Sequence, residues 1–316
     1  MHLLIPFAAP QSEAGRAAAR TLVLPQLGAL LALLQPEGRD DGDEWSLSPP
    51  HERALGQAYG WTAADGLLPW AALSAQADGL DAGKATAASA WGLLTPAHWH
   101  LGTDQVSLLD PAGLLLDDTA SRVFFAAIQD LFVDEGYSLH YATATRWYAA
   151  HDSLVALPTA SLDRVIGRNV DRWLGKDPAA RRIRRLQSEV QMRLYTHPLN
   201  DERTANGLLP VNSFWLSGCG VAQTVAPSDV QVDDRLRAPA LAEDWAGWCK
   251  AWETLDAGPM VTLRAAAQAA GAGQPQRLTL CGERASAIFT SGPRSLIRTL
   301  KSRFAAPAWL PILETL

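Results

Sequence analysis

Cysteine is scarce in this sequence: the 316 residues contain three, Cys219, Cys249 and Cys281. They lie far apart, and no CxxC pair occurs, which excludes a disulfide framework and a cysteine-based zinc site and favours a reducing compartment. Long apolar runs are also missing, since none approaches the ~18 residues that a membrane-spanning helix needs. The opening Met1–Ala8 run lacks a basic flank and is broken by Pro6, so it fits neither a signal peptide nor an anchor. We therefore expect a cytoplasmic protein without a membrane partner.

Charge is low as well. Charged residues make up 19% of the chain, against about 25% in an average globular protein. With Lys and Arg at 27 against Asp and Glu at 33, the net charge is −6, so nucleic acid is not an expected partner. The hydrophobic share of 48% suffices for a core and excludes disorder over most of the chain, and the length suggests about two domains.

Hydrophobic spacing predicts an α/β core at both ends of the chain. Near the amino end we expect a strand at Leu3–Phe7, a helix at Thr21–Leu34, a solvated loop at Gln35–Pro50 and a helix capped by Ser48. Later elements are expected at Arg181–Tyr195 (helix), Val211–Leu216 (buried strand), Leu241–Leu255 (helix), Leu278–Thr290 (two strands) and Ser295–Phe304 (helix).

The middle of the chain has a different pattern. After a small-residue stretch at Ala75–Ser89, typical of a linker, strands are expected at Ala90–Leu94, Trp99–Leu109, Tyr137–Tyr141 and Thr145–Ala149, around an amphipathic helix at Thr119–Phe132. This order indicates a compact α+β unit. We predict an α/β fold with helices on both faces of a core sheet, formed by residues 1–89 and 179–316, and a smaller inserted α+β domain at 90–178.

Arginine is concentrated in one segment. Ten of the 27 basic residues fall between Arg164 and Arg203, and nine of those are arginine. A guanidinium group binds phosphate or carboxylate through two parallel hydrogen bonds, so the enrichment suggests an anionic ligand or partner. For the run at Arg181–Arg185 a solvated helix face is the simpler alternative, whereas Arg164, Arg168 and Arg203 stand beside Gly or Asn in turn-like sequence.

Asn212 lies in an otherwise apolar strand that ends in Gly218 and Gly220, a pattern typical of a strand end where backbone approaches a ligand. A buried Asn that holds a turn is the alternative. The Ser217–Gly220 segment matches neither a P-loop nor a GxSxG nucleophile elbow, so neither ATP hydrolysis nor triad hydrolysis is supported.

Two imidazoles share one strand face in His98-Trp99-His100, because side chains two apart point the same way. They could supply half of a site for a divalent metal such as Zn or Mn, completed by Asp104, His140 or His197. An exposed strand face with two histidines and no metal is the alternative.

Several segments resemble a known family. Leu24-Pro25-Gln26-Leu27-Gly28, the region His98–Asp118, the stretch His197–Arg203 and the strand Val211–Gly220 resemble archaeal-type cofactor-independent phosphoglycerate mutases, a branch of the alkaline phosphatase superfamily. The segments "SPPHE", "TASLDRVIGRNV" and the strand "VNSFWLSGCG" are more similar to bacterial RpfE-type regulatory proteins, which are phosphoglycerate-mutase-like. The resemblance spans about residues 1–250 and implies an alkaline-phosphatase-like core.

Departures from that family bear on mechanism. The mutases use two metals, an Asp after the first strand and a Ser nucleophile, whereas this chain has Pro6-Phe7-Ala8 and, at the helix start, Pro50-His51-Glu52-Arg53. No histidine follows Asp256 in the remaining 60 residues. Without metal ions bound to it, the negatively charged phosphoryl group would have little stabilisation during its transfer. The resemblance therefore implies a degenerate enzyme in which two-metal catalysis is lost.

Two functions follow as hypotheses. The first is a regulatory or accessory pseudoenzyme that binds a phosphorylated small molecule or a protein partner. Its ligand site, in a cleft between core and inserted domain, would use Arg164, Arg168, Asn169, His197, Asn200, Arg203 and Asn212. The second is an active phosphomutase or phosphatase-like enzyme with a rearranged site on His51, Glu52, His98 and His100, the latter two with Asp104 as metal ligands.

Overall fold

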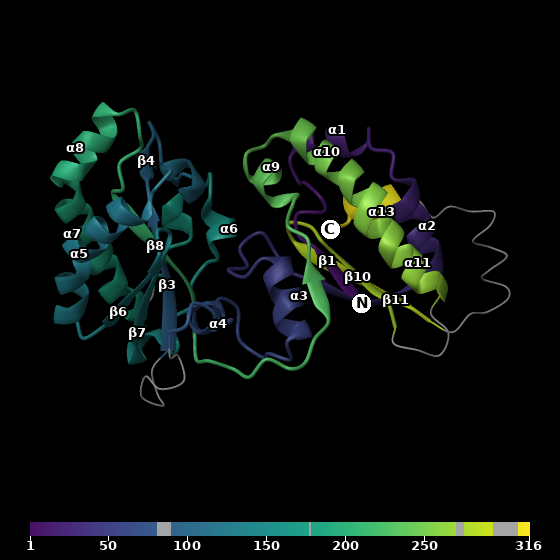
Figure 1. Cartoon of the computed structure of the whole chain (residues 1–316), viewed down its shortest axis with the longest axis horizontal. Coiled ribbons are helices and arrows are strands. Elements are labelled where there is room, and N and C mark those ends of the chain that lie inside the picture. Colours follow the sequence, from purple (N-terminus) through teal and green to yellow (C-terminus); the bar gives the residue numbers. More distant parts are fainter. Residues whose placement is uncertain (81–89, 177, 270–274, 293–308) are drawn as a thin grey trace. The chain divides into compact units, whose positions relative to one another are not determined.

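The computed structural model describes residues 1–80, 90–176, 178–269, 275–292 and 309–316. The chain forms two compact units (Figure 1): unit 1 comprises Met1–Gly60 and Val225–Leu316, and unit 2 comprises Trp61–Thr224. Unit 2 therefore starts earlier and ends later than the predicted 90–178. The reason is packing, because a helix before residue 90 covers one face of its sheet and a strand after residue 178 forms an edge of that sheet.

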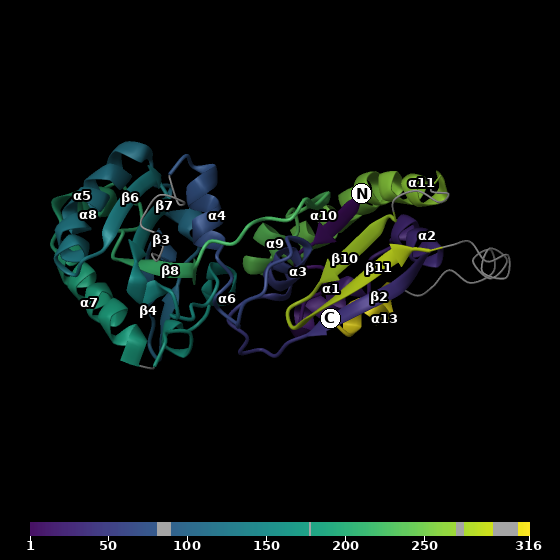
Figure 2. The ribbon, with the colours of Figure 1, turned by 90° about the horizontal axis from the view of Figure 1, so that it is seen from below.

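Unit 1 contains a five-stranded mixed sheet. Its strand order is β2 (Leu34–Asp41), β11 (Ala285–Ser291), β10 (Arg277–Cys281), β1 (His2–Ile5) and β9 (Val230–Val232). β1 runs parallel to β10 and β9, whereas β11 is antiparallel to β10 and β2 (Figure 2). The strand expected near the amino end and the two expected within Leu278–Thr290 are confirmed.

Strand β2 corrects one expectation, because residues 34–41 were predicted as the end of a helix and a solvated loop. The strand pairs with β11 along its whole length. Its sequence is polar because it lies at an edge of the sheet, where most of its residues are exposed and charges discourage pairing with another chain.

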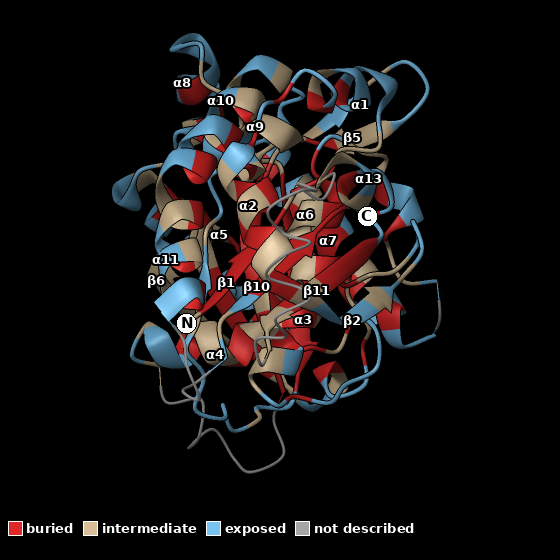
Figure 3. Cartoon of the chain, turned by 90° about the vertical axis from the view of Figure 1, so that its right-hand side faces the viewer, coloured by how far each residue is buried: buried red, intermediate tan, exposed pale blue. Residues whose placement is uncertain are grey.

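Helices cover both faces of this sheet. One face packs against α1 (Glu13–Ala19), α2 (Pro25–Leu33), α10 (Trp245–Leu255), the π-helical turn η5 (Asp256–Met260), α11 (Val261–Ala269) and α13 (Trp309–Glu314). The other face carries α3 (Pro50–Ala58), with Ala54 packed on Leu4 and Cys281. The short helix α9 (Arg237–Leu241) precedes α10. Strands β1, β10 and β11 are accordingly mostly buried (Figure 3). The predicted α/β class with helices on both faces is confirmed.

Two helix starts in unit 1 differ from simple capping rules. Ser48 does not cap α3, because the N-cap position is Pro49 and no side chain bonds there. Helix α2 also lacks a local cap, and the buried carboxylate of Asp256 takes that role from η5. Its two oxygens accept hydrogen bonds from the backbone N–H groups of Gln26, at 3.1 Å, and Leu27, at 2.7 Å. A negative charge at the positive end of the helix dipole stabilises α2 further.

Unit 2 is an α+β unit around a four-stranded antiparallel sheet. The strand order is β6 (Ser138–Thr143), β7 (Arg146–His151), β3 (Ala90–Ala97) and β8 (Ser213–Gly220). Helices α5 (Asp118–Asp134) and α7 (Arg181–Tyr195) pack on one face, and α4 (Trp70–Ala77) packs on the other. A separate hairpin is formed by β4 (Trp99–Leu101) and β5 (Val106–Leu108). The smaller elements are η1 (Pro111–Leu114), η2 (Asp152–Leu154), α6 (Leu162–Val165), η3 (Val170–Arg172), η4 (Pro178–Ala180) and α8 (Pro198–Ala205).

Two expectations fall partly or wholly outside the described residues. The expected helix at Ser295–Phe304 lies outside them. Of the expected linker at Ala75–Ser89, residues 75–77 belong to α4 and residues 81–89 are not described. No helix in the described part of the chain is long and apolar enough to cross a bilayer.

Gly218 in β8 offers a test of close packing between β8 and α4. Its φ is +63°, and a Cβ there would lie 2.9 Å from the backbone nitrogen of Ala71. Gly207 has a similar φ of +73°, and a Cβ there would have no atom within 4 Å, so it isolates the cost of the backbone conformation. We expect Gly207→Ala to cost about 1 kcal/mol and Gly218→Ala to cost about 2 kcal/mol more, because only the second meets backbone atoms. Urea unfolding measures both, and equal losses would contradict the close approach.

Candidate functional site

All of the predicted ligand-binding residues lie in unit 2. They group at two segments. The first, which we call the connector, is residues 206–212 between α8 and β8. The second, which we call the arginine turn, is residues 161–172 and includes α6 and η3. The residues of each segment differ in what their polar atoms already bind, and this decides which of them can meet a ligand.

Asn200 is committed to the connector. The side chain is 5% exposed. Its Nδ2 donates hydrogen bonds to the carbonyls of Leu194 and Val211, both at 2.8 Å, and its Oδ1 accepts one from the Val211 N–H at 2.9 Å. An Asn in this position satisfies three backbone groups that would otherwise be buried without partners. Its observed role is to join α8 to the end of the connector.

Arg203 serves the same segment. It is 5% exposed, and its guanidinium donates to the carbonyl of Leu209, at 3.0 Å, and to that of Leu114. Burial lowers the pKa of Arg203, and the nearby Asp117 carboxylate opposes this change. The guanidinium therefore ties the connector to η1, and its burial limits the access of a ligand.

Asn212 and His98 fix the other end of the connector. The Asn212 side chain pairs with the backbone of Trp99, accepting from its N–H at 2.7 Å and donating to its carbonyl at 2.9 Å. The Nδ1 of His98 donates to the carbonyl of Pro210 at 2.8 Å. Asn212 therefore does what the alternative interpretation proposed, namely hold a turn.

His197 begins α8, where its Nδ1 accepts a hydrogen bond from the Leu199 N–H at 3.2 Å. Its ring lies 5.3 Å from that of Phe124 on α5. The ring is partly exposed. The Nδ1 atom is therefore used within α8, and the ring packs beside α5.

The arginine turn is held rigidly against β5. Ser161 caps α6, and Gly167 adopts a φ of +74° while its N–H donates to the Leu108 carbonyl at 2.8 Å. Val165 and Val170, at 0% and 1% exposed, anchor it in the interior. This geometry places Arg168 and Asn169 at the half-buried surface of the turn.

Within the turn, Arg164 and Asn169 have distinct roles. Arg164 is 2% exposed and so belongs to the interior of the turn. Asn169 uses its Oδ1 to accept from the Asp171 N–H at 2.9 Å, which caps η3 and leaves its Nδ2 as a donor. Within the turn, Arg168 and Asn169 are therefore the two predicted ligand residues that are half-buried, whereas Arg164 is buried.

The predicted metal ligands come together only in part. His98 and His100 have ring centroids 6.3 Å apart, although His98 lies between β3 and β4 and only His100 belongs to a strand. His140 instead packs on Trp91 in the main sheet, at 5.2 Å, where burial lowers its pKa. Across the described ranges, no group of three or more His, Cys, Asp or Glu side chains is placed to hold a metal ion. Asp104 is exposed in the hairpin turn.

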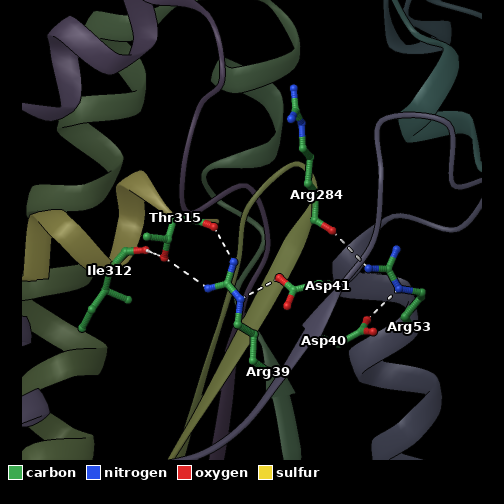
Figure 4. Close-up of polar contacts among 7 residues, drawn as sticks. All are labelled: Arg39, Asp40, Asp41, Arg53, Arg284, Ile312 and Thr315. Atoms are coloured by element: carbon green, nitrogen blue, oxygen red, sulfur yellow. Dashed lines mark hydrogen bonds and ion pairs between the residues drawn. The ribbon is translucent and has the colours of Figure 1, made fainter.

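His51 and Glu52 lie in unit 1, in the first turn of α3. The next residue, Arg53, fixes this turn. Its guanidinium donates to the Asp40 carboxylate at 2.6 Å and to the Arg284 carbonyl at 3.2 Å (Figure 4). It also donates to the Ser48 carbonyl at 2.7 Å. The neighbouring Arg39 pairs with Asp41 and reaches the backbone of Thr315. These contacts hold the amino end of α3 at the edge of the sheet.

The His51 ring lies 5.2 Å from that of Phe7, just beyond the carboxyl end of β1. Phe7 has a φ of +54°, which is unusual for a bulky residue and marks local backbone strain. The indole N–H groups of Trp248 and Trp252 donate to the carbonyls of Phe7 and Ala8, at 3.0 and 3.3 Å, and hold this conformation. No sequence signal identified Phe7, because nothing in its residue type favours a positive φ.

Comparisons with known proteins find similarity among solved structures alone. No family model matches the chain, and no curated protein matches it. Among solved structures, it is similar to the cofactor-independent phosphoglycerate mutase from Thermoplasma acidophilum DSM 1728, with 14% identity, 99% of each chain covered and a TM-score of 0.38. A second is the PH0037 protein from Pyrococcus horikoshii, with 11% identity, 92% of this chain and 87% of that chain covered, and a TM-score of 0.43. At these scores neither neighbour carries an argument about function.

The structural role of Asn200 predicts a large stability loss on its removal. Asn200→Ala leaves three buried backbone groups without partners, so we expect a loss of about 3 kcal/mol or more. Asn206→Ala is the matched control, because that exposed side chain makes one hydrogen bond, to Glu202, and should change stability by about 0.5 kcal/mol or less. Chemical denaturation compares the two. A small loss for Asn200→Ala would make this residue a candidate ligand contact again.

Proposed function

We propose that this protein is a cytoplasmic regulatory or accessory protein, degenerate with respect to phosphoglycerate mutases, that binds an anionic, phosphorylated small molecule at the arginine turn. The observation that carries the proposal is the fixed backbone of that turn, which presents Arg168 and Asn169 beside the buried Arg164. Three arginines against two aspartates, Asp163 and Asp171, give residues 161–172 a formal charge of +1.

Rigidity supports the proposal for an energetic reason. A guanidinium on a flexible segment loses conformational freedom when it binds a phosphate, and this cost weakens binding. The turn is already ordered by the Gly167 bond to β5 and by the Asn169 cap. Arg168 therefore binds a phosphate oxygen pair with little further ordering of the backbone, and Asn169 Nδ2 can add a third donor.

Two features of unit 1 favour binding over two-metal phosphoryl transfer. The residues that follow β1 are Pro6, Phe7 and Ala8, none of which offers a carboxylate. In addition, the described residues contain no cluster suited to a divalent ion, and a second metal would need further ligands. The proposal therefore assigns recognition of a phosphoester, and no turnover, to this protein.

The test is a thermal-shift titration of the full chain with inorganic phosphate and phosphoglycerate, without added metal. A ligand that binds the native state raises its apparent stability. We expect Arg168→Ala to weaken binding about tenfold or more, since a charge-assisted contact of this kind contributes about 1.5–3 kcal/mol. Arg181→Ala, an exposed arginine in the same unit, is the control and should bind as the wild type does. Equal protection of both variants would sink the assignment to the arginine turn.

One observation favours the enzyme alternative, a phosphomutase or phosphatase with a rearranged site. Phe7 holds a strained backbone at the carboxyl end of a parallel strand, where α/β proteins gather ligands, and its ring faces His51. If His51 and Glu52 contribute to a metal-dependent site, purified full chain should retain Zn or Mn in stoichiometric amount, and His51→Ala should lose it. Elemental analysis decides this, and a metal-free wild type would leave the binding function in place.

A further inference from the structure

Unit 1 contains a cavity of about 780 Å³ that no predicted site residue lines. It lies on the face of the sheet that α3 covers, at the amino ends of the parallel strands. His2 and Arg277 are the first residues of β1 and β10 and stand opposite each other in the register. Its volume falls within the range of about 300–1,000 Å³ that is typical of small-molecule sites.

One wall of the cavity carries charges of both signs. Arg277 donates two hydrogen bonds to the carboxylate of Glu37, at 2.9 and 2.7 Å. Asp229, just before β9, lies 2.6 Å from the amino group of Met1. Each of these two pairs joins one positive and one negative group, so neither pair carries a net charge. Since Arg277 uses Nε and Nη2 on Glu37, its Nη1 remains a donor, and each carboxylate keeps lone pairs for a further donor.

His2 adds a neutral polar group to this wall. It is 8% exposed, and its Nε2 is hydrogen-bonded to the Thr279 hydroxyl at 2.7 Å. Burial lowers the pKa of His2 and Arg277 lowers it further, whereas the carboxylates of Asp229 and Glu37 oppose this change, so the net shift favours the uncharged imidazole. The cavity wall thus has no net charge.

The remaining lining is mixed and leaves free space. Its apolar part comes from Ala54 and Ala58 on α3, Ile288 on β11, Pro227 and Pro275, and its polar part from Gln57 and Ser228. Gly38 pairs with Ile288 in the register and therefore faces the same side, and a Cβ placed on it would have no atom within 4 Å. This open position shows that the cavity extends over β2.

We propose that this cavity binds a zwitterionic small molecule of the amino-acid class with an apolar side chain. The ammonium group would face one of the two carboxylates, that of Glu37 or that of Asp229, and the ligand carboxylate would accept hydrogen bonds from Arg277. The apolar side chain would lie over Ala54, Ala58 and Ile288. A phosphoester dianion fits poorly here, because it would meet two carboxylates and a neutral imidazole, whereas a ligand with one charge of each sign matches the wall.

The experiment is isothermal titration calorimetry of the full chain with a panel of free L-amino acids, including L-leucine and L-methionine. In Gly38→Leu, the new side chain would enter the cavity without meeting other atoms at its Cβ, so the fold should stay intact. Circular dichroism checks this. Gly113→Leu is the matched control, since Gly113 is exposed in unit 2 and a Cβ placed on it would also have no atom within 4 Å. We expect an apolar amino acid to bind the wild type and Gly113→Leu alike, and to bind Gly38→Leu about tenfold or more weakly.

A second variant keeps the test decisive if Gly38→Leu does not fold. Arg277→Gln removes the carboxylate partner, so it should weaken binding of L-leucine and leave binding of leucinamide, which lacks the carboxylate, unchanged. Absence of binding by every amino acid in the wild type overturns the proposal, as does equal affinity of wild type and Gly38→Leu. An equal loss of L-leucine and leucinamide binding in Arg277→Gln overturns the assigned ligand class.

Discussion

Buried backbone groups must be hydrogen-bonded, and in unit 2 this constraint falls on one segment above all. The connector crosses from α8 to β8 without forming a helix or strand of its own. The N–H groups of residues 206–208 bond to carbonyls of α8, but the carbonyls of residues 209–211 need other partners. Side chains from both sides supply them: Asn200 and Arg203 from α8, and His98 from the end of β3. The side chain of Asn212, at the end of the connector, forms two hydrogen bonds with the backbone of Trp99 in β4. Without these bonds β8 would lose its fixed entry into the sheet.

The same constraint shapes unit 1. Helix α2 begins without a local cap, and Asp256 satisfies its first N–H groups from η5. At the end of β1 the strained backbone of Phe7 survives because the indoles of Trp248 and Trp252 bind the carbonyls there. In each case a residue distant in sequence completes a backbone that its own neighbours leave incomplete. The strain at Phe7 is therefore maintained by α10 and not by the strand that carries it.

These long-range bonds mark the limit of what the sequence can predict. Segments with a strong period, such as α5 and α7, were predicted almost to their ends, because their apolar spacing is set by the face that they bury. Strand β2 was missed, because an edge strand exposed on most of its length has the composition of a loop. The polar residues near the connector were identified as special, but Asn and Arg bind a backbone carbonyl and a ligand through the same donors. Residue type cannot separate the two roles, whereas measured partners can.

The distribution of charge argues that the two units recognise different chemistry. In the arginine turn, Arg168 stands beside the buried Arg164 on a backbone that needs no rearrangement, which suits an anion. In the cavity of unit 1, Arg277 already has Glu37 as its partner, and the second carboxylate and the neutral His2 leave no surplus positive charge. An anion that gains energy from the first site would meet repulsion from carboxylates in the second. A zwitterion, which carries one charge of each sign, can match the mixed charges of Glu37, Asp229 and Arg277 in that cavity. Electrostatics therefore predicts that an anionic ligand of the arginine turn does not compete for the cavity of unit 1.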